Sequence, residues 1–345
     1  MRVGIAGAGL AGRVLALKLL ARGHEVSLFE RRAPGEAGAA DVAAGMLSPL
    51  AELETGECGI YELGVRSLDL WPALLAMLDE SVPFARRGSL MVSHARDSAI
   101  ASRLIDRIRA RLGDAADDEI TSLDADALAM LEPGLPVDGP ARLLAGEGQV
   151  DARAFMRASR AFLEPRTEWH DGAEVSDVLP GELRFADGGR RRFDRVFDCR
   201  GTGASSSLPV RAVRGEILWL KTDEVTLTRP VRVMHPRYRI YVVPRGSGLF
   251  GVGATEIESD DDSPVSVRST MELVSATAIV DPAFLEARIL ASEVGLRPAM
   301  PDNQPHVDVV DGRTVINGLF RHGYLIAPAL IDDALDASLN PRSAA

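Results

Sequence analysis

The sequence predicts an α/β fold of two interleaved domains, one of Rossmann-like topology and one built on a mixed, largely antiparallel sheet. Three observations predict it. The first thirty residues alternate strand, glycine-rich turn, helix and strand. Residues 214–254 contain short alternating runs between frequent turn residues, which is typical of antiparallel strands. A second strand followed by glycines, over 193–203, indicates a return to the first sheet.

The opening residues carry the most specific local signal. An apolar strand over 2–6 leads into GAGLAG, an apolar helix and a second strand that ends at Glu30. Gly7 permits the tight turn, Gly9 lets the backbone approach a pyrophosphate, and Gly12 lets helix and strand pack closely. The helix N-terminus receives phosphate charge, and Glu30 can accept hydrogen bonds from a ribose. The motif predicts dinucleotide binding without separating FAD from NAD; a glycine-rich turn without a ligand is the alternative.

Composition narrows the class of protein. The chain has 345 residues, with 39 Lys and Arg against 50 Asp and Glu, a net charge of −11. This balance disfavours a nucleic-acid or anionic-membrane binder. Cys58 and Cys199 are the only cysteines, so we expect reduced thiols in a cytoplasmic protein, with no disulfide framework and no metal site. We find no secretory signal and no apolar run that would span a bilayer.

The first half of the chain continues with a polar loop over 31–40 and a small-residue segment over 43–47. The small residues allow a flat ring to lie against the backbone, and an alanine-rich helix that ends at Pro49 is the alternative. The elements predicted next are a helix over 57–80, a strand over 88–92, a helix over 100–112, an acidic turn over 114–119 and a short helix over 123–131.

The second half predicts a helix with Asp151 as its N-cap, followed by more strands than helices. The predicted elements are strands over 174–178, 182–185 and 193–199, the β-rich section over 214–254, helical or mixed segments over 270–290, a strand over 314–316 and a last helix after Pro328. We expect residues 340–345 to fray.

Nine short segments resemble the D-amino-acid oxidase superfamily, and most of all its thiamine-pathway glycine oxidases. They occur in the family's order and cover nearly the whole chain. The segments are GAGLAG with Glu30, Ala43–Leu47, Gly148–Asp151, Cys199–Gly203, Arg214–Glu216, Tyr241–Arg245, Gly253–Glu256, Gly295–Pro298, and Arg321–Gly323 with Ala327-Pro328.

The resemblance implies an FAD-binding domain over 1–80, 146–210 and 296–345, and a substrate domain over 81–145 and 211–295. It implies FAD rather than NAD, and oxidation of the Cα–N bond of an amino acid or amine to an imine. The imine gives a 2-oxo acid and ammonia or serves thiazole assembly, and O2 yields H2O2. Related sarcosine oxidases attach flavin through a late cysteine. This chain has none after Cys199, so we expect non-covalent FAD.

Three residues match the family's substrate site. Arg297 matches the arginine that binds the substrate carboxylate, Tyr241 a hydroxyl that assists it, and Arg321 a second arginine whose backbone carbonyl receives the amino group. The alternatives are a turn brace for Arg297, a core position for Tyr241 and a surface charge for Arg321. Hydride transfer from a neutral amine needs no protein base, so we assign His322 to a loop or packing role rather than to acid–base catalysis. We expect the helix after Pro328 to direct its N-terminus at the flavin.

The resemblance also implies which residues hold FAD. They are Gly7, Gly9, Leu10, Ala11, Gly12, Glu30, Arg31, Ala44, Gly45, Met46, Val175, Gly201, Gly203, Arg297, Arg321, His322, Gly323, Tyr324 and Leu325.

One segment departs from the family pattern. Many relatives carry Gly-His-Tyr-Arg-Asn-Gly where this chain has Gly-Leu-Phe-Arg-His-Gly over 318–323. Because this segment is expected near the substrate and the flavin, the departure bears on whether glycine is the substrate and whether O2 is the electron acceptor. Two alternatives stay open: a D-amino-acid dehydrogenase with an acceptor other than O2, and a flavoprotein that acts on another protein. Homo-oligomer formation also stays open.

Overall fold

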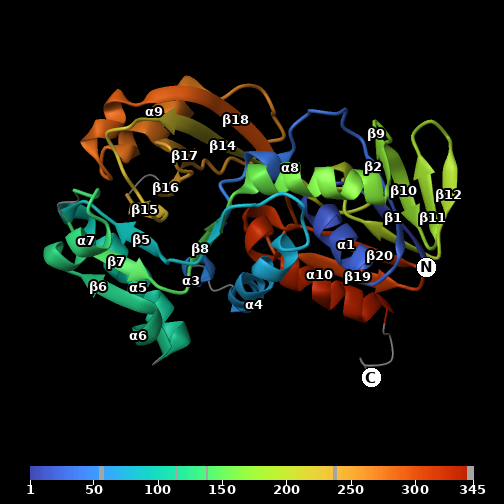
Figure 1. The fold of residues 1–345 in the computed structure, drawn as a ribbon, viewed down its shortest axis with the longest axis horizontal. Coiled ribbons are helices and arrows are strands. Elements are labelled where there is room, and N and C mark those ends of the chain that lie inside the picture. The colour runs from blue at the N-terminus through green and yellow to red at the C-terminus, as the bar shows by residue number, and fades with distance from the viewer. Residues whose placement is uncertain (54–57, 114, 137–138, 236–238, 340–345) are drawn as a thin grey trace.

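The computed structural model describes residues 1–53, 58–113, 115–136, 139–235 and 239–339. Their strands form two large sheets, which lie toward opposite ends of the molecule, and two small ones (Figure 1). The fold is mixed α/β, as predicted. Among the described residues, no helix is long and apolar enough to cross a bilayer.

The first large sheet has six strands, and all neighbours within it are parallel except one hairpin. In spatial order they are β19 (His306–Val310), β20 (Arg313–Asn317), β13 (Arg195–Asp198), β1 (Arg2–Ala6), β2 (Glu25–Glu30) and β9 (Glu168–Asp171). The predicted return of the chain to this sheet is confirmed, because β13 pairs directly with β1. On one face pack α1 (Leu10–Ala21), α8 (Ala152–Leu163), α4 (Cys58–Leu75) and α10 (Gly323–Leu339).

The other face of this sheet is covered by a small antiparallel sheet. Its strands are β10 (Val175–Leu179), β11 (Glu182–Phe185) and β12 (Arg190–Arg192). Phe29, Leu183 and Val196 belong to the apolar cluster between the two sheets. The end of β2, where Glu30 lies, is therefore held between two packed layers.

The second large sheet has eight strands and is mixed, largely antiparallel. In spatial order they are β18 (Arg288–Ala299), β14 (Arg211–Lys221), β17 (Leu249–Gly253), β16 (Arg239–Pro244), β15 (Val231–Met234), β5 (Ser89–Val92), β7 (Ala141–Leu144) and β6 (Ile120–Leu123). Around it lie α5 (Ser98–Leu112), α6 (Ala115–Glu119), α7 (Ala125–Leu131) and α9 (Val267–Thr277). Leu218, Val252 and Leu273 join α9 to one face of this sheet.

A three-stranded sheet lies between the two large ones. It consists of β3 (Met46–Leu47), β8 (Gly148–Val150) and β4 (Phe84–Ala85). The short helices α2 (Ala39–Val42) and α3 (Pro49–Glu52) lie on either side of β3 in the chain. The proposed domain boundaries stay a prediction; β18 continues the eight-stranded sheet as far as Ala299.

One alternative and two local predictions are wrong. Pro49 begins α3 rather than ending a helix, because proline is well tolerated in the first turn. The acidic stretch forms α6, and Asp114 lies outside the described residues, as do residues 340–345. The last helix begins at Gly323 and contains Pro328. The proline deprives the Tyr324 carbonyl of its helical partner, and the indole Nε1 of Trp71 donates to that oxygen at 3.0 Å instead.

Candidate active site

A cavity of about 710 Å³ lies between the two large sheets. Every predicted cofactor-binding and substrate-binding residue lines it except Gly12. The structure therefore brings together side chains and backbone from both ends of the chain and from several segments in between. Their individual roles stay predictions.

The glycine loop forms one wall of the cavity. Gly7 has a φ of +96°, and a Cβ atom there would lie 2.4 Å from the Cys199 carbonyl oxygen. A Cβ atom on Gly12 would lie 2.0 Å from the Gly7 carbonyl oxygen, whereas one on Gly9 would meet nothing within 4 Å. Gly7 and Gly12 are thus fixed by contacts within the protein, and Gly9 leaves open space before the N-terminus of α1. Leu10 and Ala11 begin that helix.

Glu30 is oriented at the end of β2. Its Oε2 accepts from the Ala8 amide at 3.0 Å, and its Oε1 accepts from the amide and guanidinium of Arg32, each at 3.1 Å. Arg31, Val175, Gly201 and Gly203 line the same part of the cavity. The arrangement suits the hydroxyl-rich adenosine half of a dinucleotide.

Contacts on the side away from the cavity fix the small-residue segment over 43–47. Gly45 has a φ of +66°, and a Cβ atom there would lie 2.0 Å from the Val150 carbonyl oxygen. Arg245 donates to the Ala44 carbonyl and, at 2.7 Å, to Oε1 of Gln149. Ala44 and Met46 line the cavity, so this wall presents small side chains and backbone to any flat ring.

A second helix N-terminus faces the same space. His322, Gly323, Tyr324 and Leu325 line the cavity where α10 begins. A Cβ atom on Gly323 would lie 3.3 Å from Cδ2 of Leu10, so the starts of α10 and α1 are neighbours. The Tyr324 hydroxyl lies 3.0 Å from the Ala40 carbonyl oxygen, which anchors the first turn. The predicted helix N-terminus at the cavity thus exists five residues earlier in the chain than Pro328.

The roof of the cavity is one face of the eight-stranded sheet. Arg297 pairs with Val213 in register, and Tyr241 pairs with Gly253, which pairs with Ile217. Paired residues share a face, as do residues two apart on one strand, so Arg297 and Tyr241 project from the same face. Arg297 lies within a strand, so the turn-brace alternative is wrong.

Two glycines make room for these side chains. A Cβ atom on Gly215 would lie 2.3 Å from Cζ of Arg297, and one on Gly253 would lie 3.1 Å from the Tyr241 hydroxyl oxygen. Burial lowers the pKa of Arg297, and it raises the pKa of the Tyr241 phenol. Arg297 is a half-buried guanidinium at a cavity wall, and among the described residues its recorded hydrogen bond is to a backbone carbonyl rather than to a carboxylate. Such a group favours an anionic ligand.

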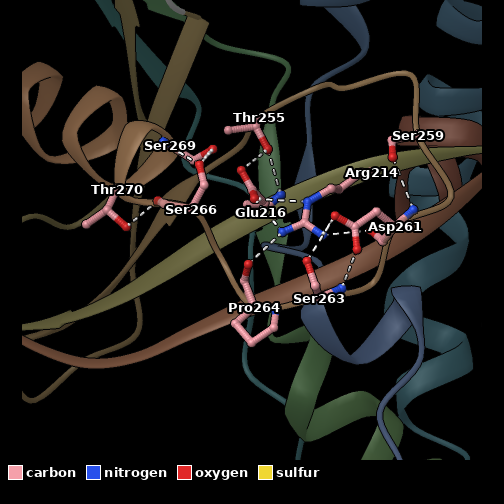
Figure 2. Close-up of polar contacts among 10 residues, drawn as sticks. All are labelled: Arg214, Glu216, Thr255, Ser259, Asp261, Ser263, Pro264, Ser266, Ser269 and Thr270. Atoms are coloured by element: carbon pink, nitrogen blue, oxygen red, sulfur yellow. Dashed lines mark hydrogen bonds and ion pairs between the residues drawn. The ribbon is translucent and has the colours of Figure 1, made fainter.

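A buried polar network on the opposite face holds the loop that orients Arg297. Arg297 Nη1 donates to the Thr255 carbonyl at 2.9 Å. The Thr255 hydroxyl donates to Glu216 Oε2 at 2.9 Å and accepts from the Glu216 amide at 3.0 Å. Figure 2 shows Glu216 in turn bound by Arg214, whose Nε and Nη2 donate to Oε1 at 3.0 and 2.7 Å.

Arg214 extends this network to the following loop. Its Nη1 donates to the Asp261 carbonyl at 2.7 Å and its Nη2 to the Pro264 carbonyl at 3.0 Å (Figure 2). Arg214 and Glu216 are both buried. Because each is paired and hydrogen-bonded, the pair fixes the loop rather than leaving buried charge unmatched.

Arg321 is not a lone surface charge. Its guanidinium pairs with Glu52 at 2.8 Å and with Glu256 at 3.6 Å. Glu52 also lies 3.4 Å from Nδ1 of His322. Although burial raises the pKa of Glu52, its interaction with His322 and the positive charges of Arg321 and Arg232 lower it to about 2. The cluster joins α3 to the turn before α10.

Sequence reasoning missed several cavity residues and their supports. They are Glu52, Glu216, Arg232, Arg245, Thr255 and Glu256. Arg245, Glu216, Thr255 and Glu256 lie inside segments that carried the resemblance, so their presence there was a usable signal. Arg232 and Glu52 gave none, because the residues that surround them in the fold are far away in the sequence.

The residues present fit FAD. The open space over Gly9, the oriented carboxylate of Glu30 and the two helix N-termini suit a pyrophosphate and adenosine. The small-residue wall at Ala44 and Gly45 suits an isoalloxazine ring. These residues would hold the group between the loop and the sheet roof.

Comparisons with known proteins agree with this geometry. A family model described as "DAO: FAD dependent oxidoreductase" matches residues 2–332. A protein of Rhizobium etli named "Putative thiamine biosynthesis oxidoreductase ThiO" is 40% identical over 96% of this chain and 94% of its own. A glycine oxidase of Geobacillus kaustophilus is 26% identical over 94% of this chain and 89% of its own.

A crystal structure of glycine oxidase from Geobacillus kaustophilus supports the fold. It superposes with a TM-score of 0.82 at 24% identity, over 100% of this chain and 98% of that one. The match of the family model along almost the whole chain and the 40% identical relative agree with a cavity that fits FAD. The chain therefore belongs to the DAO family of FAD-dependent oxidoreductases.

Proposed function

We propose that this FAD-dependent oxidoreductase oxidises glycine or another small amino acid or amine. The observation that carries the proposal is the pair Arg297 and Tyr241, which project from one sheet face into the cavity that fits FAD. The names of the Rhizobium and Geobacillus relatives support the substrate class and a place in thiamine biosynthesis, where the imine product would be consumed.

The chain's own residues would hold the substrate. Arg297 binds the α-carboxylate, and the Tyr241 hydroxyl donates to the same group. The backbone carbonyl of Arg321 accepts from the amino group, which turns the Cα–H bond toward the small-residue wall. With its carboxylate and amine both fixed, a small amino acid has little orientational freedom left.

Bound FAD supplies the acceptor for the hydride that leaves Cα. As this hydride departs, the amine lone pair forms the C=N bond and the nitrogen releases a proton. Water then hydrolyses the imine to a 2-oxo acid and ammonia. O2 takes the two electrons and two protons to give H2O2. In this scheme no side chain has to remove a proton from carbon.

The visible spectrum of the purified protein tests the proposal. We expect a flavin band that bleaches when glycine or N-methylglycine is added without oxygen, and stoichiometric H2O2 when oxygen is admitted. A flavin band that no small amine bleaches would refute the proposed substrate class. Bleaching without H2O2 would favour an electron acceptor other than O2.

A further inference from the structure

A second arginine on the cavity roof has no place in the proposed reaction. Arg232 lies on β15 directly opposite Tyr241 on β16, so it shares the face that carries Tyr241 and Arg297. It lines the same cavity. Its positive charge and that of Arg297 both lower the pKa of the Tyr241 phenol, which burial raises. Both guanidinium groups therefore belong to the same wall of the cavity as Tyr241.

Arg232 lacks a direct counter-ion among the described residues. Its Nε is buried without a hydrogen-bond partner, and the described part of the chain offers it no ion pair. A buried N–H donor without a hydrogen-bond partner is destabilising, which favours an anion beside it.

Two carboxylates feel the charge of Arg232, and both form their direct contacts with other residues. Glu52 pairs with Arg321 and lies beside His322. Glu147 is fully buried, accepts from the Ser89 hydroxyl and from the Ala51 amide, and has a pKa that burial raises. The charge of Arg232 lowers the pKa of both carboxylates, but neither forms an ion pair or a hydrogen bond with its guanidinium. Within the described part of the chain, Arg232 therefore has no directly bound anion.

We infer that Arg232 binds a second carboxylate of the substrate, so that the preferred substrate is a small amino acid with an additional acid group on its side chain or its nitrogen. Arg297 holds the α-carboxylate and Arg232 the second one, with the Tyr241 hydroxyl between them. The inference rests on the proposed function for the reaction, whereas the binding of two carboxylates can be measured without turnover.

Ligand binding gives the direct test. Acetate is compared with malonate, succinate and glutarate by the change each causes in the flavin spectrum of the holoenzyme. We expect at least one dicarboxylate to bind roughly tenfold to a hundredfold more tightly than acetate, as a second charged hydrogen bond would provide. Equal affinity for acetate and for all three dicarboxylates would overturn the inference.

Two variants and one control assign the effect to Arg232. Arg232→Met should remove the dicarboxylate preference with little change in acetate affinity, and Arg232→Lys should restore part of it. Arg66→Met changes the net charge equally at an exposed pair with Asp333 and should leave the preference intact. A preference that survives in Arg232→Met, or equal weakening of acetate and dicarboxylates, would also overturn the inference.

Turnover separates this inference from the proposed function. Anaerobic bleaching by D-aspartate or iminodiacetate should exceed that by glycine in the wild type, and Arg232→Met should reverse the order. If glycine bleaches the flavin best and Arg232→Met changes nothing, the proposed function stands and the inference fails. If dicarboxylates bind tightly but no amine bleaches the flavin, the proposed function fails and the binding role stands.

Discussion

The two ends of the cavity are built in opposite ways. The dinucleotide end consists of backbone and glycine from a continuous stretch, β1, the loop and α1, with Glu30 at the end of the next strand. The substrate end consists of long polar side chains, Arg232 on β15, Tyr241 on β16 and Arg297 on β18. A carbonyl from a loop far away in the sequence accepts a hydrogen bond from Arg297. The dinucleotide end depends on the absence of side chains, whereas the substrate end depends on particular side chains and on the groups that orient them.

The difference predicts different failures. A substitution at the dinucleotide end should affect folding or FAD retention, because a new atom has no space. A substitution at the substrate end should leave FAD bound and change substrate affinity, because it alters a charge or its orientation.

The largest effect is expected at Gly12. In Gly12→Val the Cβ would lie 2.0 Å from the Gly7 carbonyl oxygen, so the loop and α1 must separate. We expect little folded protein and no flavin in it, measured as soluble yield and as the ratio of flavin to protein absorbance. Gly59→Ala, where a Cβ meets nothing within 4 Å, is the control.

Gly9→Ala completes that comparison. Its Cβ also meets no protein atom, but it would enter the space assigned to the pyrophosphate. We expect a folded protein with weakened FAD affinity. Wild-type FAD affinity in Gly9→Ala would show that the pyrophosphate lies elsewhere.

This contrast also explains what could be predicted from the sequence. The residues of the dinucleotide end are close together in the sequence. The spacing of Gly7, Gly9 and Gly12, with Glu30 after the next strand, was therefore sufficient to predict this end of the cavity. The start of α10 was misplaced, because the partner that accommodates Pro328 is Trp71, some 250 residues away in the chain. Arg232 was missed because its position opposite Tyr241 depends on the register between two strands, which no short motif encodes.

The next effect concerns Glu52, which joins the two ends through Arg321 and His322. Its pKa of about 2, against an ordinary 4.5, corresponds to about 3 kcal/mol of folding free energy near neutral pH, at about 1.4 kcal/mol per pKa unit. Because the folded-state pKa is depressed, this stabilisation is present above pH 4.5 and is lost as pH falls toward 2. We expect Glu52→Gln to be less stable at pH 6. Its free energy of unfolding, measured with denaturant, should also fall less between pH 4.5 and pH 2 than that of the wild type. The same fall in unfolding free energy over this pH range in both proteins would contradict this.

Arg297→Ala tests the substrate end. Loss of a charged hydrogen-bond donor should weaken glycine binding by about 1.5–3 kcal/mol, roughly a tenfold to hundredfold rise in KM, while FAD stays bound. Glycinamide, which lacks the carboxylate, should show a smaller change in the same variant. An unchanged KM for the best amino-acid substrate would exclude Arg297 as the carboxylate anchor.

The smallest effect is expected at Thr255, which touches Arg297 through its backbone and Glu216 through its hydroxyl. Thr255→Val removes the hydroxyl that donates to Glu216 Oε2 and accepts from the Glu216 amide, so the loop should shift and Arg297 with it. We expect substrate affinity to fall by about 1 kcal/mol, roughly fivefold, with FAD content unchanged. Thr255→Ser keeps both hydrogen bonds and should restore affinity. If Val and Ser variants bind glycine equally, the network beneath the sheet serves stability alone, and the substrate end depends on the roof face by itself.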